Sequence, residues 1–145
     1  MSPNLSEMQY ALSRTLLRAR EVVMLELRPL LARHDITEQQ WRVLYALAEQ
    51  GPLEATALAD EASIRPPSLT RIIKALEVRQ YMERSNVKGD GRRTLLAIMP
   101  AGLALIEELN PARIAIYDGI RQRFGESQHK QLLNLLEALI QSRQG

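Results

Sequence analysis

The side chains best suited to chemistry in this sequence are basic ones, gathered in a single segment. Between Ser63 and Arg93, eight lysines and arginines stand against three acidic residues, which gives the segment a net charge of +5. The whole chain carries only +2, so the remainder is slightly acidic at −3. A local cationic segment of this kind is typical of a surface that binds a polyanion. Charge alone leaves a second interpretation open, namely a basic face that interacts only with solvent.

Catalytic and metal chemistry find little support in the sequence. The chain has no cysteine, which excludes disulfides, thiolate nucleophiles and cysteine-ligated metals. Its two imidazoles, His34 and His129, lie outside any local cluster of metal-ligating residues. We find no nucleophile elbow, phosphate-binding loop or zinc signature. We therefore predict a protein that is not an enzyme and that binds no metal and no cofactor.

Two short helices, one just before the basic segment and one within it, predict a helix-turn-helix. Residues 54–61 form the first helix, and Pro66-Pro67 opens the second. On a helical wheel the second helix has an apolar face opposite a face that is polar and cationic. The apolar face holds Leu69, Ile72, Ile73 and Leu76, and the opposite face holds Pro67, Thr70, Arg71 and Lys74.

A helix with such a face fits the major groove of B-DNA. There Arg71 would read guanine O6 and N7, and Thr70 would contact a base edge or a thymine methyl group. Ser68 at the helix N-terminus and Lys74 are better placed for phosphates. An ordinary amphipathic helix with solvated basic residues is the alternative interpretation.

A basic β-hairpin follows this helix. Residues 81–85 and 94–98 are strand-like, and the polar segment between them contains two glycines. An arginine near such a tip can enter a narrow minor groove, and Asp90 would orient Arg92 through a charge-assisted hydrogen bond. A surface turn is the alternative, but helix and hairpin together favour nucleic-acid binding. The predicted DNA-binding residues are Arg65, Pro67, Ser68, Thr70, Arg71, Lys74, Lys88, Asp90, Arg92 and Arg93.

The remaining elements are helices, so the predicted fold is mainly α with a small β-hairpin wing. A long first helix reaches about Arg33, with Pro29 expected to kink or end it, and a capping box at Thr37 and Gln40 opens the next. A fifth helix starts at Pro100 and is expected to break or bend at Asn110-Pro111, and a last helix follows Gly125. The predicted architecture is a single domain, 1–145, with a winged helix-turn-helix lobe at 36–99 and an α-helical dimerisation region at 5–34 and 100–143.

Length and composition agree with one folded domain that is a homodimer. The 145 residues are 46% apolar, enough for a core without disulfides. The first and last two helices carry more leucine and isoleucine than the small lobe could cover, so part of that surface needs a partner. A two-fold dimer would place its recognition helices roughly 34 Å apart and select a pseudo-palindromic operator. With no apolar run near 20 residues and no signal-peptide pattern at the start, the expected location is the cytoplasm.

A small-molecule site is suggested by four residues. Arg20 points along an apolar part of the first helix, where an unpaired charge is unfavourable. Its guanidinium could pair with a ligand carboxylate, form an internal salt bridge, or extend to solvent. Trp41 and Tyr45 lie one turn apart and could form an aromatic wall, while His34 could hydrogen-bond a phenolic hydroxyl. Ordinary packing or a helix-end position would also explain these three residues.

The order of elements, the segment Ala62–Arg71 and the wing sequence Asp90-Gly91-Arg92 resemble the winged helix-turn-helix regulators of the MarR (multiple antibiotic resistance regulator) family. Within that family the chain is most similar to regulators of homoprotocatechuate (4-hydroxyphenylacetate) degradation. The narrower similarity rests on Ala19-Arg20-Glu21, the run from Arg33 to Arg42, the run from Arg65 to Thr70, and Arg123-Phe124-Gly125-Glu126.

This resemblance implies an obligate dimer that releases DNA when a small aromatic effector binds, with aromatic carboxylates held between the dimer helices and the DNA-binding lobe. The chain departs from the family where Ile98-Met99 replaces a frequent Leu-Thr pair whose threonine caps the next helix. We therefore expect a looser junction there, partly compensated by Pro100 at the first helical position. A regulator with another aromatic or antibiotic-like effector, an activator, and a helical interaction module that does not bind DNA remain as alternatives.

Overall fold

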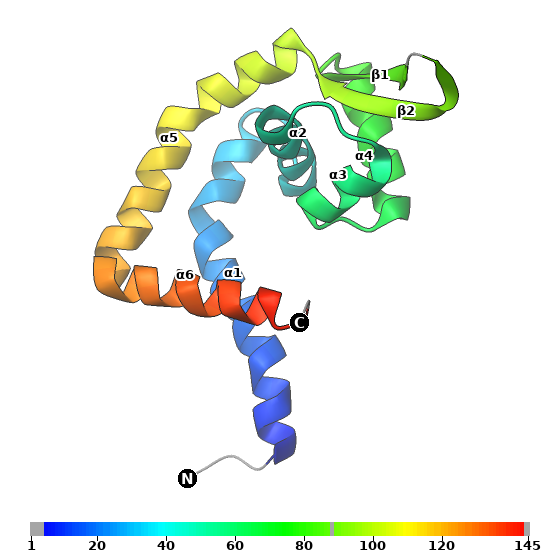
Figure 1. Cartoon of the computed structure of the whole chain (residues 1–145). Helices are drawn as coiled ribbons and strands as arrows, with labels where there is room; N and C mark the ends of the chain where they lie inside the picture. Colours follow the sequence, from blue (N-terminus) through cyan, green and yellow to red (C-terminus); the bar gives the residue numbers. More distant parts are fainter. Residues whose placement is uncertain (1–4, 88, 144–145) are drawn as a thin grey trace. The chain divides into compact units, whose positions relative to one another are not determined.

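The structure is a computed structural model that describes residues 5–87 and 89–143, without the side chains of Leu5, Ser6, Gln9, Val87, Asp90 and Arg92. This part of the chain forms six helices and one hairpin, which are labelled in Figure 1. Their order is α1 (Leu5–Ala32), α2 (Glu38–Gln50), α3 (Ala55–Ala62), α4 (Pro66–Val78), β1 (Met82–Val87), β2 (Asp90–Ile98), α5 (Pro100–Phe124) and α6 (Glu126–Gln141). The predicted mainly α fold with a hairpin wing is confirmed.

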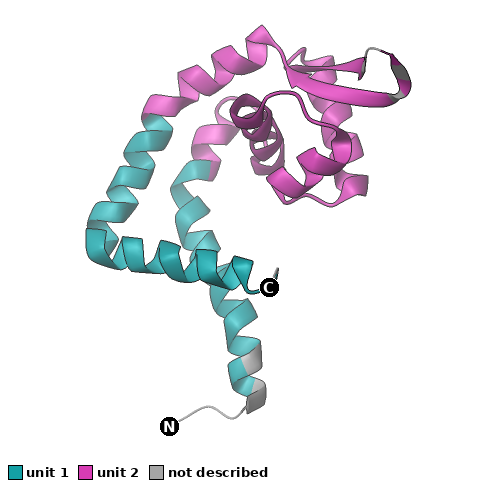
Figure 2. Cartoon of the chain, in the orientation of Figure 1, with its two compact units in different colours: residues 1–27, 112–145 teal, residues 28–111 magenta. Residues whose placement is uncertain are grey.

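The chain divides into two compact units, coloured separately in Figure 2. The first, which we call the lobe, is residues 28–111 and holds α2, α3, α4 and the hairpin with the adjoining ends of α1 and α5. The second, which we call the helical unit, holds the rest of α1, the rest of α5, and α6. None of the described helices is long and apolar enough to span a membrane.

The hydrophobic core lies almost entirely in the lobe. Among the described residues, Met24 and Leu27 are the only buried apolar side chains of the helical unit. In the lobe each helix turns one face inward, and α2 alone buries Trp41, Val43, Leu44, Ala46 and Leu47. Burying a leucine or isoleucine side chain contributes roughly 1.5–3 kcal/mol. The lobe therefore has the burial that a stable fold requires, and it holds the predicted DNA-binding elements in place.

Helix α2 begins at the capping box that the sequence predicts. The Thr37 hydroxyl accepts a hydrogen bond from the Gln40 backbone at 3.0 Å, and the Gln40 side chain accepts one from the Thr37 backbone at 3.0 Å. Two otherwise unpaired donors at the helix start are thereby satisfied.

The hairpin is antiparallel, with Met82 opposite Ile98 and a register shift at Asn86/Val87. Its strands extend closer to the tip than the predicted 81–85 and 94–98. Leu53, which precedes α3, forms an isolated antiparallel bridge to β2: Leu53 and Leu96 exchange backbone hydrogen bonds of 3.0 and 2.8 Å. The wing is therefore attached through its backbone to the segment that leads into α3.

The junction between wing and α5 is tightly packed, although position 99 is a methionine and not a capping threonine. The Met99 backbone donates a hydrogen bond to the Tyr81 carbonyl at 2.9 Å, and the Met99 carbonyl accepts from Leu103 at 3.0 Å. Gly102 is buried against Tyr81, where an added Cβ would lie 2.5 Å from the Tyr81 carbonyl oxygen. Backbone hydrogen bonds and a close glycine contact therefore pack this junction, and its looseness stays a prediction.

Two prolines lie inside helices rather than at their ends. Pro29 is within α1, which continues to Ala32, and Pro111 is within α5, which continues to Phe124. A proline removes one helical donor and leaves a carbonyl without its usual partner. Both prolines are exposed, so water can hydrogen-bond to that carbonyl, and the interruption predicted at Asn110-Pro111 does not end α5.

Candidate nucleic-acid interface

Helix α4 presents the two faces that its sequence predicts. Leu69, Ile72, Ile73 and Leu76 are buried in the core of the lobe. Pro67, Thr70, Arg71 and Lys74 are exposed on the opposite face, and Ser68 is half-buried. The Thr70 hydroxyl donates to the Pro66 carbonyl at 3.2 Å, which leaves its oxygen able to accept a hydrogen bond. An exposed row of hydroxyl, guanidinium and ammonium groups on a rigid helix can contact base edges and phosphates.

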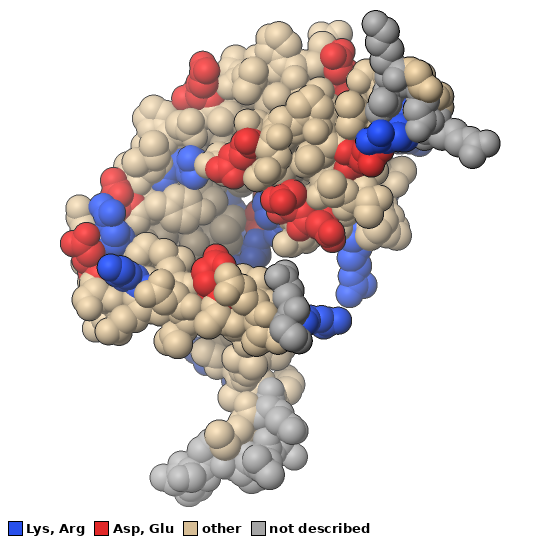
Figure 3. Space-filling model, viewed as in Figure 1, with Lys and Arg blue, Asp and Glu red and all other residues tan. Residues whose placement is uncertain are grey.

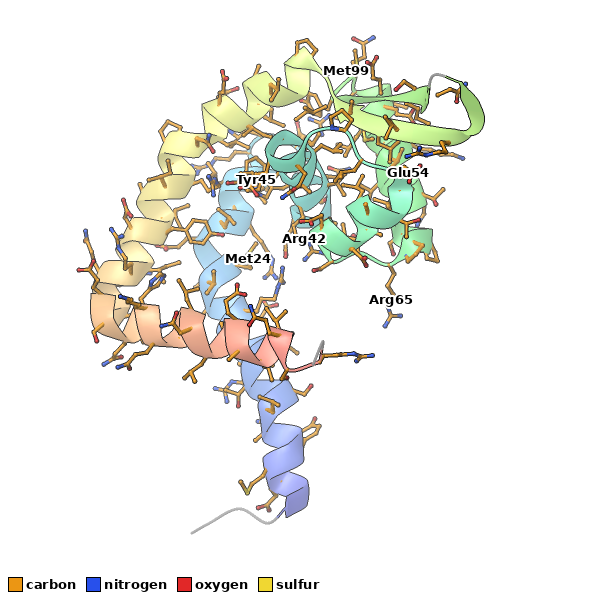
Figure 4. All side chains as sticks on the ribbon, viewed as in Figure 1. Met24, Arg42, Tyr45, Glu54, Arg65 and Met99 are labelled. Carbon is orange, nitrogen blue, oxygen red and sulfur yellow. The ribbon has the colours of Figure 1, made fainter. Side chains whose placement is uncertain are left out.

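The turn between α3 and α4 fixes where this helix begins. Ser63 adopts a left-handed conformation with φ 54°, and its backbone N–H closes the end of α3. Ile64 is buried and anchors the turn, whereas Arg65 is exposed at the N-cap of α4. Figure 4 shows the Arg65 side chain pointing away from the lobe. Arg65 is thereby available to a ligand next to the helix N-terminus.

A shallow groove joins the start of α2 to the exposed face of α4. Its volume is about 310 Å³, and Ser68 and Arg71 line one side. Thr37, Gln39 and Gln40 line the other side. Sequence reasoning did not assign Gln39 to a site, although its place in the first turn of the capped helix α2 is a signal that could have found it. The groove brings amide, hydroxyl and guanidinium groups together beside the helix that would enter DNA.

The wing is described only in part. Lys88 lies outside the described residues, and Asp90 and Arg92 are described as backbone of β2 without their side chains. The predicted contact between Asp90 and Arg92 therefore lies outside the described side chains. Arg93 is exposed, and its Nε lies 2.6 Å from Oε1 of Glu54, the N-cap residue of α3.

Several cations of the basic segment have internal contacts. Arg84 of β1 pairs with Glu77 of α4 at 2.9 Å. Arg79 donates to the carbonyls of His34 and Asp35 and to the Tyr81 hydroxyl, and it stacks over the Tyr81 ring. On the face shown in Figure 3, basic and acidic side chains are interspersed. The net charge of +5 therefore overstates the number of cations that are available to a polyanion.

Arg42 is a partly buried cation that sequence reasoning did not single out. Its guanidinium lies 3.3 Å from Glu38 and 3.5 Å from the Ser63 carbonyl, while its Nε is buried with no hydrogen-bond partner. Burial lowers the pKa of the Arg42 guanidinium below its ordinary value. Arg42 links α2 to the turn of the helix-turn-helix, and Figure 4 labels its position.

The four residues predicted for an effector fall into both units. Trp41 is buried and stacks with Tyr45 of the next turn, with ring centroids 5.7 Å apart. In the same lobe, Nδ1 of His34 lies 4.0 Å from Oε1 of Glu108. Arg20 belongs to the helical unit. Among the described residues no group of histidines and carboxylates could hold a metal ion.

The helical unit contains an apolar cavity of about 520 Å³. Residues of α1, α5 and α6 line it: Ala19, Val22, Val23, Tyr117, Ile120, Phe124, His129, Leu132, Leu133 and Leu136. None of the α6 residues is buried. The exposed large apolar side chains of the described chain also lie in this unit, with Val78 and Leu103 as the exceptions.

Comparison with known proteins places this arrangement in a family. The model of the MarR family matches residues 36–94, which hold α2 to α4 and most of the hairpin. The chain is 38% identical to the HTH-type transcriptional regulator FarR of Neisseria gonorrhoeae over 124 residues, covering 86% of this chain and 85% of the relative. It is 36% identical to the homoprotocatechuate degradative operon repressor of Escherichia coli over 133 residues, covering 92% of this chain and 90% of the relative.

A solved structure agrees with these sequence relatives. The crystal structure of NadR in complex with 4-hydroxyphenylacetate superposes with a TM-score of 0.78 at 37% identity, covering 88% of this chain and 91% of NadR. FarR and the homoprotocatechuate protein are named as a transcriptional regulator and a repressor, not as enzymes, as the sequence predicts. The helix-turn-helix, the wing and these relatives together show that the chain belongs to the MarR family of transcriptional regulators.

Proposed function

We propose that this regulator is a homodimeric repressor that occupies a pseudo-palindromic operator and leaves it when a small phenolic carboxylate binds. The operator would control degradation of an aromatic acid of the homoprotocatechuate or 4-hydroxyphenylacetate type. The observation that carries the DNA-binding part is the face of α4. Its opposite side is the core of the lobe, so Thr70, Arg71 and Lys74 are held rigidly outward.

The shortage of buried side chains in the helical unit supports dimerisation. Apart from Met24 and Leu27, its described apolar residues are at least partly exposed, and α6 buries none. Exposed apolar area on this scale marks an interaction surface in a soluble protein. A second copy of the chain would cover it symmetrically and set the distance between two recognition helices.

The effector proposal rests on the relatives and on the aromatic pair of α2. NadR, at 37% identity, has been crystallised with 4-hydroxyphenylacetate, and the homoprotocatechuate repressor of E. coli controls an operon for a related compound, as its name states. Tyr45 stacks on the buried Trp41 and is itself partly exposed, so its ring would offer a flat apolar contact for a phenyl group. Arg20 would pair with the ligand carboxylate, and His34 with the phenolic hydroxyl.

Selection of DNA from a random pool tests the operator proposal. We expect duplexes with two-fold-symmetric half-sites about 10 bp apart, and weaker retention when 4-hydroxyphenylacetate is added before selection. An effector that favours the state unable to bind DNA would shift operator affinity by roughly 1–3 kcal/mol. Recovery of asymmetric sequences, or of no sequence above background, would contradict the proposal.

Thermal unfolding with aromatic acids tests the effector. A ligand at about 100 times its Kd stabilises the native state by about 2.7 kcal/mol, so the Tm should rise measurably. We expect a rise with 4-hydroxyphenylacetate that is lost in Arg20→Ala and kept in Arg18→Ala, a control with an exposed arginine on the same helix. The same rise in both variants would remove Arg20 from the site. No rise with any aromatic carboxylate would refute the proposed effector class.

A further inference from the structure

Glu54 stands at the point where the wing meets α3. It follows Leu53, whose backbone pairs with Leu96 of β2, and it is the N-cap residue of α3. Its side chain makes no capping hydrogen bond to the helix and instead contacts the Arg93 guanidinium, with Nε and Oε1 2.6 Å apart. Figure 4 shows Glu54 between α3 and the wing.

This ion pair is open to solvent. The Arg93 side chain is 54% exposed and that of Glu54 is 44% exposed. Ion pairs at such positions contribute little net stability, because water and salt compete for both charges. The pair can therefore open without unfolding the lobe, and the backbone bridge between Leu53 and Leu96 keeps the wing attached when it does.

A DNA phosphate offers Arg93 the same chemistry as the Glu54 carboxylate. Both present anionic oxygens that accept hydrogen bonds from a guanidinium. A phosphate that binds Arg93 must displace the Glu54 carboxylate or share the guanidinium with it, and an unpaired Glu54 would then repel the phosphate. Each of these effects reduces the gain in affinity from Arg93.

We propose that Glu54 is an intramolecular competitor for DNA, which holds Arg93 in the free protein and lowers the affinity for DNA of any sequence. The inference rests on the proposed DNA-binding function and adds a residue that tunes it. Affinity for arbitrary DNA comes from phosphate contacts, and it determines how much repressor is lost to the rest of the genome. A carboxylate paired with one phosphate-binding arginine limits that loss while the contacts of α4 to base edges are unchanged.

The test is binding of the full chain to a fluorescent 30-bp duplex of random sequence, followed by anisotropy over a series of salt concentrations. Glu54→Gln keeps the size and hydrogen-bonding capacity of the side chain but removes its charge. We expect it to bind the duplex roughly tenfold more tightly at low salt, with a salt slope steeper by about 0.9 per subunit. Glu83→Gln, on exposed β1 of the same wing and outside both wing ion pairs, is the control for net charge. It should change affinity by less than half as much on a logarithmic scale.

The double variant Glu54→Gln with Arg93→Ala, together with the two single variants, completes a double-mutant cycle. If Glu54 acts through Arg93, its substitution has no effect when Arg93 is absent. Equal effects of Glu54→Gln and Glu83→Gln, or an effect that persists without Arg93, would overturn this inference alone. A wild-type chain that binds no duplex at low salt would overturn the proposed function as well. Thermal unfolding verifies that each variant is folded.

Discussion

The arginines of the lobe have two different roles. Arg71 is exposed on the outward face of α4, where its guanidinium can reach a ligand. Arg79 and Arg84 instead join elements of the lobe to one another, through backbone carbonyls and through Glu77. Residue type and net charge do not separate these roles, because a guanidinium binds phosphate, carboxylate and carbonyl oxygens alike. The contacts of each side chain are what distinguish them.

Truncation of the Arg71 side chain should reduce the preference of the protein for its operator over other DNA. We expect Arg71→Ala to weaken operator binding by about 1–3 kcal/mol and to leave binding to random DNA nearly unchanged, because a base-edge contact is lost. Lys74→Ala, one turn further along the same face, should weaken both and reduce the salt slope by about 0.9 per subunit. Competition binding with operator and random duplexes at several salt concentrations measures both quantities.

The two variants serve as controls for each other, since each removes one exposed cation from α4. If Arg71→Ala and Lys74→Ala reduce operator and random binding by the same factor, Arg71 is a phosphate contact and the assignment of base reading to it is wrong.

Periodicity was sufficient to predict which α4 residues face outward, because burial of one helix face follows directly from the spacing of apolar residues. The partners of Arg93 and Arg42 were not predictable in this way. Glu54 is 39 residues from Arg93, and the Ser63 carbonyl is 21 residues from Arg42. Such pairs exist only after the chain has folded, and a single sequence has no local pattern that records them.

Between elements, a close contact lies where the wing joins α5. Gly102 lies so close to the Tyr81 carbonyl that a side chain at this position would overlap it. The Met99 backbone also donates to that carbonyl. Tyr81 in turn contacts Arg79, which donates to carbonyls of the turn that follows α1. The turn after α1, the base of the wing and the start of α5 thus meet around Tyr81.

Replacing this glycine should therefore destabilise the lobe. An added Cβ in Gly102→Ala would lie 2.5 Å from the Tyr81 carbonyl oxygen and 2.8 Å from the Ile98 side chain. Because backbone must move to relieve this overlap, we expect a loss of about 1–3 kcal/mol in the free energy of unfolding, even though alanine favours helix. Chemical denaturation with urea measures the change.

Gly119 of the same helix provides the matched control. A Cβ there would lie 3.4 Å from Nη1 of Arg123, the end of a flexible side chain. Gly119→Ala should be neutral or stabilising by up to about 1 kcal/mol, from helix propensity alone. A Gly102→Ala variant as stable as Gly119→Ala would show that the junction tolerates a side chain.

The elements themselves were largely predictable from local signals, and the exceptions have a physical cause. Caps, apolar spacing and turn residues predict α2, α4 and the hairpin, because each depends on interactions within a few residues. Of the break or bend predicted at Asn110-Pro111, the break does not occur, since the exposed position of Pro111 allows solvent to satisfy the carbonyl it leaves unpaired. The tight wing junction depends on the approach of Gly102 to Tyr81, 21 positions earlier in the chain, which local signals do not report.

In the molecule as a whole, the two units differ in how many apolar side chains they bury. The lobe contains its own core, whereas the described part of the helical unit buries only Met24 and Leu27. Sequence composition predicts this excess of apolar surface. It does not predict which residues line the cavity of about 520 Å³, because that depends on how α1, α5 and α6 converge. Two chains would bury together what one chain exposes, and dimerisation would then be part of folding.

Coupling between association and folding would make the stability of the chain depend on its concentration. If the helical unit is stable only as a dimer, the Tm of the wild-type chain should rise with protein concentration, since mass action favours the associated native state. Leu133, 50% exposed and lining the cavity of the helical unit, is suited to disrupt it. Leu133→Asp should lower the Tm and yield monomers in analytical ultracentrifugation, because an unpaired carboxylate in an apolar interface is strongly unfavourable. Val78→Asp makes the same chemical change at an 84% exposed position of the lobe and should leave the dimer intact. A Tm independent of concentration, or a Leu133→Asp variant that remains dimeric, would contradict the assignment of dimerisation to this surface.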